Sequence, residues 1–543
     1  MLIGYVSDED FVAVSGALLE FEAPDGAARQ AVSSASGAVR LDPAPAPGEY
    51  RVVVACPGYG TKLTRVRLGA GPPVQIRLLR SRLLGYVWPK AVRAGDPYEL
   101  RISSPHPYRC ELWRYGATRE FVAHLGHGEH PPGATAQVTP DGDHTGTGVG
   151  WNQTGLSLGP GLSAPPRLLS APARSGLYAV HVLARDGSVT TCPWVVAPAR
   201  PTADIAVVAS DLTWNAYNAF GGRSNYLHAG GLPAAPDTNR RQTLPRYTTP
   251  AHEEWGRDAY PPLSFDRPEP ENQIPLDERL DGPITWRDAC ALAAADWRLL
   301  GWLERAGYSA DVYAETQLAR GELDLTRYRV LVLGAHPEYW TVGMYEQVKS
   351  WVHDAGGRLV YLGGNGINCA VTLHDNASMT VLNGNAGVLE PRRAEVESRF
   401  GLVHEPEARL LGVGYTRAGL FTAAPYQVLR PDHWAFARTG VGAGDLIGTR
   451  TLSTRFPGGA SGHETDKLSP SSPAGVTVLA RGTNPGSGGA EMATYSTGSG
   501  GAVFAAGSIN FVTALPIDGV LDRLLRNVLA RFLTPTPTGL KEE

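Results

Sequence analysis

The sequence predicts a multidomain protein in which N-terminal β-sandwich modules are followed by an α/β domain with a parallel sheet. Three observations lead to this prediction. The chain has 543 residues, which is too long for one ordinary hydrophobic core. Its first 200 residues contain short alternating stretches separated by Gly, Pro and Asp turns, a pattern typical of antiparallel sheets. Farther along, continuous apolar runs alternate with amphipathic stretches, as in parallel strands joined by helices.

Two β units are expected before the α/β domain. Residues 1–80 are predicted to form a small sandwich, because stretches such as "ALLEFEAP" and "EYRVVVACPG" alternate apolar and polar residues. The stretch "ASGAVRLDPAPAPGEYRVVVACPGYG" resembles carboxypeptidase-regulatory or collagen-binding B-type modules. Residues 81–200 form the second predicted sandwich. Its clearest element is "GLYAVHVLARDGSVTTCPWVV", in which Asp186-Gly187 lies between two strands, as a type I′ turn requires.

Residues 201–543 are predicted to form the α/β domain. Its strands are expected in "ADIAVVAS", "RYRVLVLGA", "RLVYLGG" and "GAVFAAGSI". The stretch "DACALAAADWRLLGWLERAGY" has apolar residues at helical spacing and ends at Gly307, a suitable C-cap. "VGMYEQVKSWVHDAGG" and "GVLDRLLRNVLARFL" predict two further helices. Residues 370–500 are Gly-rich and irregular, and we expect them to form a long insertion with strands of its own.

Composition excludes several classes of protein. The net charge is −4 and Lys and Arg are scattered, so no nucleic-acid partner is expected. The first residues, "MLIGYVSDED", lack the basic and apolar regions of a signal peptide, and no apolar run reaches the length of a membrane helix. We therefore expect a cytoplasmic protein with no membrane partner. Five widely spaced cysteines without a C-x-x-C pair predict neither a disulfide framework nor a thiolate zinc site.

Polar residues follow three of the predicted strands. Tyr217 lies in "SDLTWNAYNAFGGRSNY" after the first strand, Glu338 in "HPEYW" after the second, and Asn365 in "GGNG" after the third. Ligands of open parallel sheets bind in the crevice at the carboxyl ends of the strands. The three side chains are therefore expected to face one crevice, although a glutamate in this place can also simply cap the following helix.

A series of blocks resembles a known family. The blocks are "TWNAYNAFGGRSNY", "SFDRP", "HPEYW", "GGRLVYLGGNG", "DHWAF", "GHETD" and "GGAVFAAGSINF", and the similarity around them runs from about residue 80 to residue 533. In their order they resemble the large (beta) subunit of N,N-dimethylformamidase and its relatives. The resemblance implies a C-terminal domain similar to class I glutamine amidotransferases. It also implies one mononuclear Fe³⁺ ion that is held by two tyrosines and one glutamate.

Carried over to this chain, the resemblance assigns the metal ligands. The glutamate falls on Glu338 in "HPEYW" and the first tyrosine on Tyr217 in "AYN". Tyr260 in "RDAYPPLSF" fits the spacing of the second tyrosine best, with Tyr226 and Tyr247 as competitors.

The resemblance also implies three further roles. His336 would be a polar neighbour of the metal, Asn365 would orient the substrate, and Glu464 in "GHETD" would be the general base. The continuation "DRPEPENQIP" after "SFDRP" departs from relatives that have an aromatic residue there, and this difference concerns the shape of the pocket.

The chemistry of these residues is coherent. Phenolates and carboxylates are hard, anionic ligands that suit Fe³⁺ better than the His and Cys sets of zinc. A free phenol has a pKa of about 10, so only a strong Lewis acid keeps two tyrosines ionised at neutral pH. We expect a metal-dependent amide hydrolase that cleaves a small or secondary-metabolite amide by metal-assisted attack of water. The expected partners are this amide, further copies of the chain in a homo-oligomer, and possibly a small subunit as in dimethylformamidase.

Two competing sites and two competing functions are also considered. His124, His127 and His130 in "HLGHGEH" are spaced like metal ligands but lie in what we expect to be a solvated loop. Cys369 in "GGNGINCAV" lacks the small-x-Cys-x-Gly pattern of a nucleophile elbow. The alternative functions are hydrolysis of another C–N bond at the same metal site, and non-catalytic carbohydrate or protein binding through the β modules.

Overall fold

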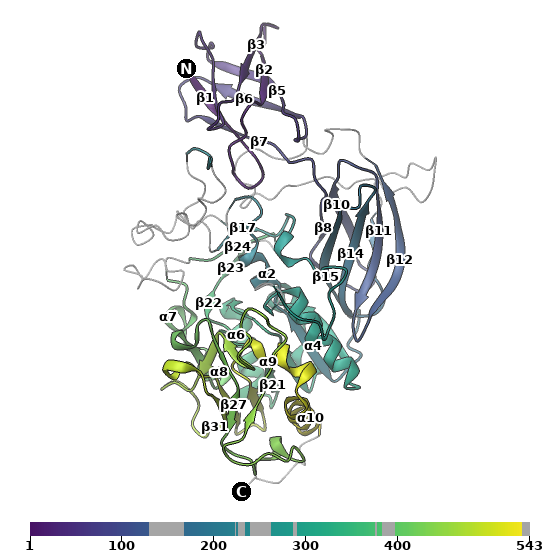
Figure 1. Cartoon of the computed structure of the whole chain (residues 1–543), viewed down its shortest axis with the longest axis vertical. Helices are drawn as coiled ribbons and strands as arrows, with labels where there is room; N and C mark the ends of the chain where they lie inside the picture. Colours follow the sequence, from purple (N-terminus) through teal and green to yellow (C-terminus); the bar gives the residue numbers. More distant parts are fainter. Residues whose placement is uncertain are drawn as a thin grey trace.

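The arrangement of three groups of sheets is clear in the computed structural model (Figure 1). The first β unit lies at one end, the second β unit at its side, and the central α/β layers below both. The structure describes residues 1–129, 168–222, 224–225, 234–238, 262–285, 290–374, 377–382 and 397–534. Within these ranges, no helix has the length and apolar character needed to cross a membrane.

The first β unit consists of two sheets around a common core. One sheet contains β1 (Leu2–Ser7), β4 (Ala38–Arg40) and β7 (Val74–Arg77), and the other contains β2 (Leu18–Glu22), β3 (Ala28–Val32), β5 (Gly48–Ala55) and β6 (Lys62–Leu68). Alternate residues of β5, such as Val52 and Val54, are fully buried in this core, while Arg51 is exposed. This alternation confirms the sandwich-like pattern that the sequence predicts.

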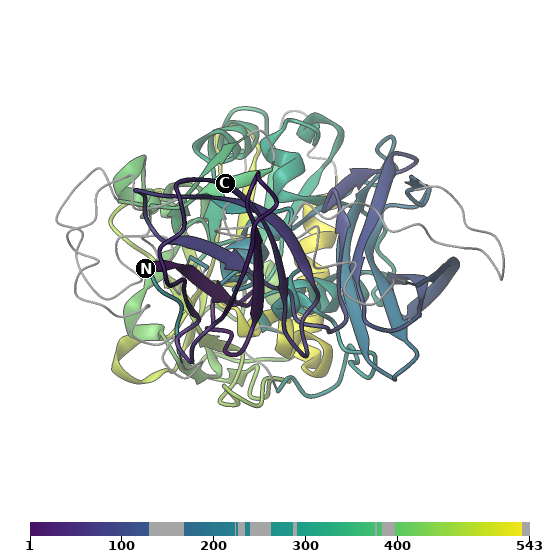
Figure 2. The same ribbon diagram turned by 90° about the horizontal axis from the view of Figure 1, so that it is seen from above.

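The second β unit also has two sheets. Its three-stranded sheet contains β8 (Leu84–Trp88), β10 (Pro97–Ser103) and β13 (Leu169–Ser170), and its five-stranded sheet contains β9 (Ala91–Arg93), β11 (Tyr108–Tyr115), β12 (Arg119–Gly128), β14 (Gly176–Ala184) and β15 (Val189–Ala197). Tyr98 and Trp194 pack in its core with ring centroids 4.5 Å apart. Figure 2, seen from above, shows the two β units side by side.

The hairpin between β14 and β15 differs from the expected type I′ turn. A type I′ turn needs positive φ at both central residues, but only Gly187 has a positive φ, at 87°. Gly187 N–H donates to Ala184 O, and Ala184 N–H donates to Ser188 O. The loop therefore has three residues, a turn followed by a left-handed glycine, which is the next most common hairpin connection.

The α/β domain is built on a nine-stranded sheet. Its first five strands are parallel and lie in the order β18 (Ala310–Ala314), β16 (Ile205–Ala209), β19 (Val330–Leu333), β21 (Arg358–Tyr361) and β33 (Ala502–Ala505). The remaining strands are antiparallel: β32 (Glu491–Ser496), β31 (Thr477–Gly482), β27 (Tyr426–Val428) and β28 (Leu446–Ile447). The described part of the irregular region 370–500 thus adds four strands to the central sheet, and its other strands form small sheets apart from it.

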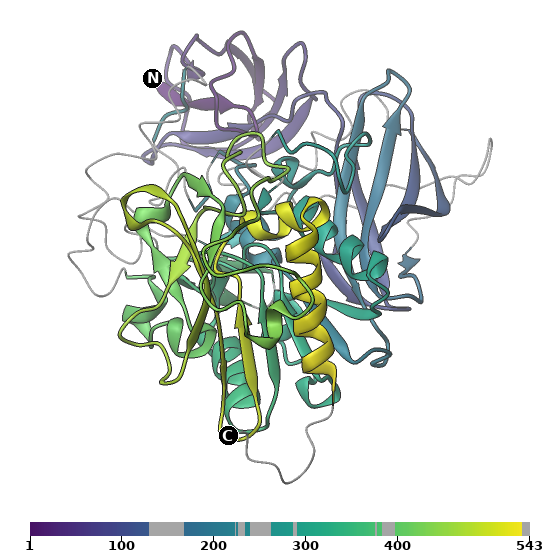
Figure 3. The ribbon, with the colours of Figure 1, turned by 60° about the horizontal axis from the view of Figure 1, so that its bottom comes forward.

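Both faces of the central sheet are covered by helices. In β19, Val330 and Val332 join the core below α4 (Ala293–Arg305) and α10 (Gly519–Leu533). Leu331 and Leu333 join the opposite core, below α6 (Val342–His353). Figure 3 shows α10 lying along the face of the sheet. The continuous apolar runs of the sequence therefore mark strands that are buried on both sides.

Shorter elements connect these layers. The short helices are α2 (Asp211–Tyr217), α5 (Glu315–Ala319), α7 (Phe400–Val403), α8 (Ala408–Leu411) and α9 (Asn510–Ala514). The short strands are β17 (Leu263–Ser264), β20 (Tyr339–Trp340), β22 (Cys369–Ala370), β23 (Thr372–His374), β24 (Ser378–Thr380), β25 (Gly414–Thr416), β26 (Thr422–Ala424), β29 (Ser461–His463) and β30 (Thr465–Lys467). Gly307, two residues beyond α4, has a φ of 86°, which agrees with the predicted glycine stop.

Buried carboxylates hold the N-terminus of α2. Asp296 Oδ2 accepts hydrogen bonds from Ser210 N at 3.3 Å and from Trp214 Nε1 at 3.2 Å. Glu315 Oε2 accepts one from Leu212 N at 3.1 Å. These acids satisfy amides that a helix cannot pair internally. Burial raises the pKa of Asp296 to about 7.

This raised pKa predicts the pH dependence of stability. The pKa of Asp296 is higher in the folded chain than its ordinary value of 3.8. Its contribution to the free energy of unfolding is therefore complete below about pH 4 and lost as the pH rises through about 7. We expect Asp296→Asn to remove up to about 3 kcal/mol of this pH dependence between pH 5 and pH 8, measured by urea unfolding. Exposed Asp281→Asn is the control, and an unchanged slope in Asp296→Asn would contradict the assignment.

Candidate active site

Three neighbouring parallel strands deliver the predicted site residues to one edge of the sheet. β16 leads into α2, which ends at Tyr217. β19 leads into the loop with His336 and Glu338, and β21 leads into the loop with Asn365. The strands are paired in register, with Val207 beside Val332 and Val332 beside Val360, so all three end at the same level. The geometry places these distant segments together.

Tyr217, His336 and Glu338 are in direct contact. The Tyr217 hydroxyl donates a hydrogen bond to Glu338 Oε2 at 3.2 Å and lies 3.2 Å from His336 Nε2. The same His336 nitrogen lies 3.0 Å from Glu338 Oε2. Glu338 is 4% exposed and His336 is 1% exposed. The Tyr217 phenol and the Glu338 carboxylate therefore lie in contact where little water can reach them.

Asn365 bridges two carboxylates. Its Nδ2 donates to Glu338 Oε1 at 3.2 Å and to Glu464 Oε2 at 2.9 Å. Its backbone has a φ of 54°, in the left-handed region, which asparagine tolerates better than most residues. Within the described residues, the buried Oδ1 atom of Asn365 has no hydrogen-bond partner. This oxygen could therefore accept a hydrogen bond from a ligand.

Glu464 reaches the site from a segment that is distant in the sequence. It lies between β29 and β30 and is 3% exposed. Its backbone passes close to Gly364, where a Cβ atom would lie only 2.3 Å from Glu464 O. The second glycine of "GGNG" therefore permits this close approach. Glu464 Oε2 also lies 3.7 Å from His336 Nε2, so one imidazole faces both carboxylates.

The electrostatics of the site favour a charged His336. Its Nδ1 lies 3.0 Å from Gly364 O, and a carbonyl can only accept, so Nδ1 carries a proton. Burial disfavours the imidazolium, but the hydrogen bond to Glu338 and the negative charges of Glu338 and Glu464 outweigh it and raise the pKa of His336 to about 8. The imidazolium partly balances the two buried carboxylates.

Asp466 and Tyr415 also belong to this neighbourhood, although the sequence interpretation did not include them. Asp466 Oδ1 accepts the backbone N–H of Asn365 at 2.7 Å, and Oδ2 accepts the hydroxyl of Tyr361 at 2.7 Å. Burial raises the pKa of Asp466 to about 7. The spacing of Glu464 and Asp466, two residues apart next to a strand, was a usable signal, because such residues share a face.

Tyr415 had no comparable signal in the sequence. It lies in β25 directly opposite Asp466 in β30. Burial, followed by the negative charges of Glu464 and Glu338, raises the pKa of Tyr415. Its phenol therefore stays protonated, and it interacts electrostatically with both carboxylates of the site.

The candidates for the second tyrosine ligand, Tyr260, Tyr226 and Tyr247, all lie outside the described residues. Their assignment therefore stays a prediction. The neighbouring block "SFDRP" is described, and its Arg267 is fully buried. Arg267 donates to the backbone oxygens of Asn215 and Asn218, on either side of Tyr217, at 3.1 and 2.9 Å. This block supports the segment that carries the first tyrosine.

The competing sequence candidates do not form catalytic sites in the described structure. His124 and His127 lie on strand β12 rather than in the expected loop, and the exposed His124 lies 4.0 Å from Glu111. His130 lies outside the described residues. Burial raises the pKa of the Cys369 thiol well above its usual range, which does not suit a nucleophile. All five cysteines are free thiols, as predicted.

Two other features were considered as sites. Donor atoms of Glu346, His404 and Glu405 lie within 4.8 Å of one another, but Glu405 already pairs with Lys349 and Arg409. A cation there would have to displace both side chains.

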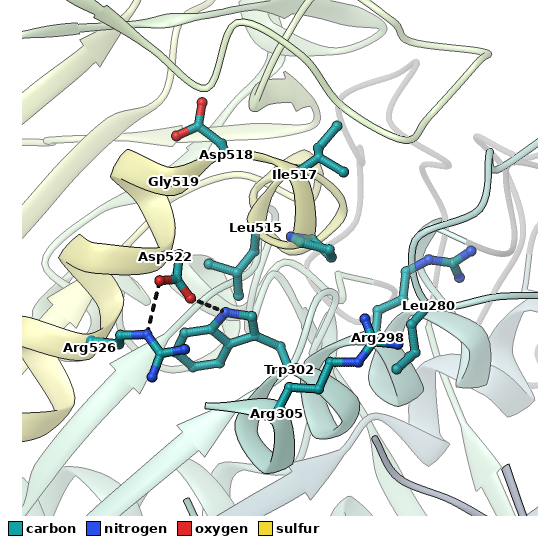
Figure 4. A pocket seen from close by; sticks show the side chains of 11 residues that line it. Leu280, Arg298, Trp302, Arg305, Leu515, Ile517, Asp518, Gly519, Asp522 and Arg526 are labelled. Carbon is teal, nitrogen blue, oxygen red and sulfur yellow. Dashed lines mark hydrogen bonds and ion pairs between the residues drawn. The ribbon is translucent and has the colours of Figure 1, made fainter. Parts of the chain in front are cut away.

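A cavity of about 380 Å³ lies between α4 and α10 (Figure 4). Its Asp522 is hydrogen-bonded to Trp302 and Arg526, and its Asp518 caps α10. Both acids of this cavity are therefore engaged in structural contacts.

Two solved structures show a weak likeness to parts of this chain. The major pilin subunit of Bacillus cereus is 12% identical, with a TM-score of 0.15, and the match covers 38% of this chain and 71% of that one. A DUF3823 family protein from Bacteroides ovatus is 11% identical, with a TM-score of 0.13, over 36% of this chain and 97% of that one. Scores this low carry no argument about the fold.

Sequence comparisons are more informative. The beta subunit of N,N-dimethylformamidase from Paracoccus aminophilus is 28% identical over 290 residues, and the corresponding subunit from Alcaligenes sp. is 27% identical over 287 residues. Each match covers 45% of this chain but only 37% of the relative. The family model "N,N-dimethylformamidase beta subunit-like, C-terminal" matches residues 111–523. Because this match covers well over half of the chain, the chain belongs to the N,N-dimethylformamidase beta subunit-like family.

Proposed function

We propose that this protein is a mononuclear iron-dependent amidohydrolase. The observation that carries the proposal is the contact between the Tyr217 hydroxyl and Glu338 Oε2, at 3.2 Å, beside the second carboxylate Glu464. The family supports an amide as the substrate, since its named relatives are subunits of N,N-dimethylformamidase. Buried carboxylates without enough positive charge cost stability, so such a cluster is typical of functional sites.

The donor set fits a hard, highly charged cation. Two oxygen donors 3.2 Å apart can bind the same ion when each bond is about 2 Å long. Phenolate and carboxylate oxygens suit Fe³⁺. Tyr260 would be the third ligand, with Tyr226 and Tyr247 as its alternatives. When bound, the ion would supply Lewis acidity that polarises an amide carbonyl and acidifies water.

The other residues then take definite roles in hydrolysis. Glu464 accepts a proton from water as its oxygen attacks the carbonyl carbon, and it returns this proton to the amide nitrogen as the C–N bond breaks. The products are a carboxylic acid and an amine. Asn365 orients the substrate, for which its Oδ1 offers an acceptor. His336 balances the charge of Glu338 and Glu464, which it contacts at 3.0 and 3.7 Å.

Alternatives share part of this evidence. The same residues could hydrolyse another C–N bond, because the site fixes the reaction class and not the shape of the substrate. A non-catalytic carbohydrate- or protein-binding function would require no metal. Stoichiometric iron in the purified protein separates the enzyme proposals from the binding proposal.

Further proposals concern the architecture and assembly. Five parallel strands covered on both faces support a glutamine amidotransferase-like domain. The division into residues 1–80, 81–200 and 201–543, the homo-oligomer, the small subunit and the cytoplasmic location stay predictions from the sequence.

The ligand assignment predicts a joint loss of metal and activity. Tyr217→Phe and Glu338→Ala each remove one hard oxygen donor, so iron affinity is expected to fall by more than about 100-fold. Metal analysis and the visible tyrosinate-to-iron absorption measure this loss directly, and amide hydrolysis is expected to disappear with it. Tyr328→Phe is the control, because Tyr328 lies in the core between the sheet and α6. Wild-type iron content in Glu338→Ala would refute the assignment.

The role of Glu464 predicts a different pattern. Glu464→Gln keeps the shape of the side chain and its hydrogen bond from Asn365, but it cannot accept a proton. We expect turnover to fall by about 10²- to 10⁴-fold while iron and its colour remain. Glu49→Gln, at an exposed position of the first β unit, serves as the control. Turnover close to wild type in Glu464→Gln would mean that another residue is the base.

A further inference from the structure

The segment that follows Tyr217 rests on the first β unit. The described parts of this segment are residues 218–222, 224–225 and 234–238. They contact residues 10–13 and 75–77, which belong to the first β unit and lie about 140 to 230 positions earlier in the sequence. We call residues 8–13 and 75–80 the N-terminal clamp.

The first contact is a buried cation over an aromatic ring. Arg77 is fully buried, and its Nη1 donates a hydrogen bond to Gly221 O at 3.1 Å. The guanidinium lies 5.1 Å from the centroid of the Phe11 ring. Phe11 is also fully buried, and it packs so closely on Gly222 that a Cβ atom at Gly222 would lie 2.7 Å from Phe11 Cβ. Because Gly222 has no side chain, its backbone can lie directly against the side chain of Phe11.

The second contact is made by backbone groups. Val12 and Asp237 form a parallel β-bridge. Asp237 N–H donates to Phe11 O at 3.1 Å, and Ala13 N–H donates to Asp237 O at 2.7 Å. Gln75 Nε2 adds a hydrogen bond to Ala234 O at 2.9 Å. The clamp therefore holds the segment at two places.

The clamp itself is rigid. Asp8 Oδ1 accepts hydrogen bonds from Asp10 N and Val12 N, both at 2.9 Å, and Asp8 forms an ion pair with Arg80. Phe11 has a φ of 61°, a conformation that costs energy for an aromatic residue and persists only where the surroundings enforce it. A loop built in this way is suited to hold another segment in place.

The second β unit and the α/β domain hold the same segment from the other side. Phe220 is buried against Leu84 and Tyr86 of the second β unit, next to Leu79 at the end of the clamp. Arg267 Nη1 donates to Phe220 O at 2.6 Å. Residues 218–222 are therefore held between the β units and the "SFDRP" block.

This support matters because α2 is short. α2 has 7 residues, about two turns, and Tyr217 is its last residue. Helices of this length have little stability of their own. The direction of the Tyr217 side chain therefore depends on what fixes the chain before and after α2.

We propose that the N-terminal clamp is a positioning element of the candidate active site, which fixes the chain beyond Tyr217 and thereby aims the phenol at Glu338. Arg77 and Phe11 are positioning residues, because they act through Gly221 and Gly222 and do not touch Tyr217. The effect of the clamp on catalysis rests on the proposed function, whereas the effect of the clamp on the mobility of α2 does not.

The first test uses hydrogen exchange in the full-length protein. Arg77→Met removes the hydrogen bond to Gly221 and the charge over Phe11 while it keeps much of the side-chain volume. We expect the amides of residues 211–222 to exchange about tenfold faster, with the strands β19 and β21 unchanged. Arg65→Met is the matched control, since Arg65 is exposed in the same β unit and, in the part of the chain that the structure describes, forms an ion pair with Glu49 alone. Unchanged exchange in 211–222 for a folded Arg77→Met would overturn the proposal.

The second test approaches the contact from the opposite side. Gly222 has a φ of 92°, which asparagine tolerates, but any Cβ there meets Phe11. Gly187 has a similar φ of 87° with nothing within 4 Å of an added Cβ. We expect Gly222→Asn to accelerate exchange in 211–222 as Arg77→Met does, whereas Gly187→Asn does not. Equal exchange in the two asparagine variants would count against the clamp.

Iron content and turnover then separate the two proposals. If the wild type binds iron, Arg77→Met and Gly222→Asn are expected to lower both iron occupancy and turnover, each by about threefold to tenfold. Neither substitution changes a metal ligand. Faster exchange in these variants, together with a wild type that binds no iron, would refute the proposed function and support the clamp. An active wild type with variants of unchanged exchange would refute the clamp and leave the proposed function intact.

Discussion

The burial of two carboxylates beside one imidazole is the constraint on which the candidate site depends. Glu338 and Glu464 are both almost fully buried, and their charges would be costly in a dry interior without compensation. His336 contacts both, and the amide of Asn365 donates to both. The Tyr217 phenol adds a further donor. Each neighbour reduces the cost of the buried charges, and the same arrangement leaves hard oxygen atoms at one point in space.

The central sheet makes this arrangement possible. Three parallel strands end side by side, so residues separated by more than 100 positions meet without long connecting loops. Glu464 lies between β29 and β30, which belong to small two-stranded sheets apart from the central sheet, and the nearby Asp466 fixes the backbone of Asn365. Acids from α4 and α5 hold the start of α2, and the N-terminal clamp holds the chain beyond its end. The β units therefore contribute to the precision of a site that lies in the α/β domain.

Local patterns in the sequence predicted most of the parallel strands and the long helices of the α/β domain. Continuous apolar runs marked β16, β19, β21 and β33, because a strand covered on both faces must be apolar on both. Apolar residues at helical spacing predicted α4, and Gly307 predicted where it ends. The strand β18 was missed, since "ADVYA" is short and is interrupted by an aspartate. The type I′ turn was wrong because the dipeptide Asp-Gly also fits a longer loop with one left-handed residue.

The sequence by itself determined which residues lie at strand ends. The blocks it shares with the family indicated which of these residues belong to one site. The sequence could not determine distances between them, because contact among Tyr217, Glu338, Asn365 and Glu464 depends on strand order and register. Those depend on long-range packing and not on any local pattern. Only the tertiary structure brought Asp466 and Tyr415 to the site and seated the segment after Tyr217 on the first β unit. Both are pairings between distant segments, and their free energy comes from burial and hydrogen bonds that form only when the whole chain has folded.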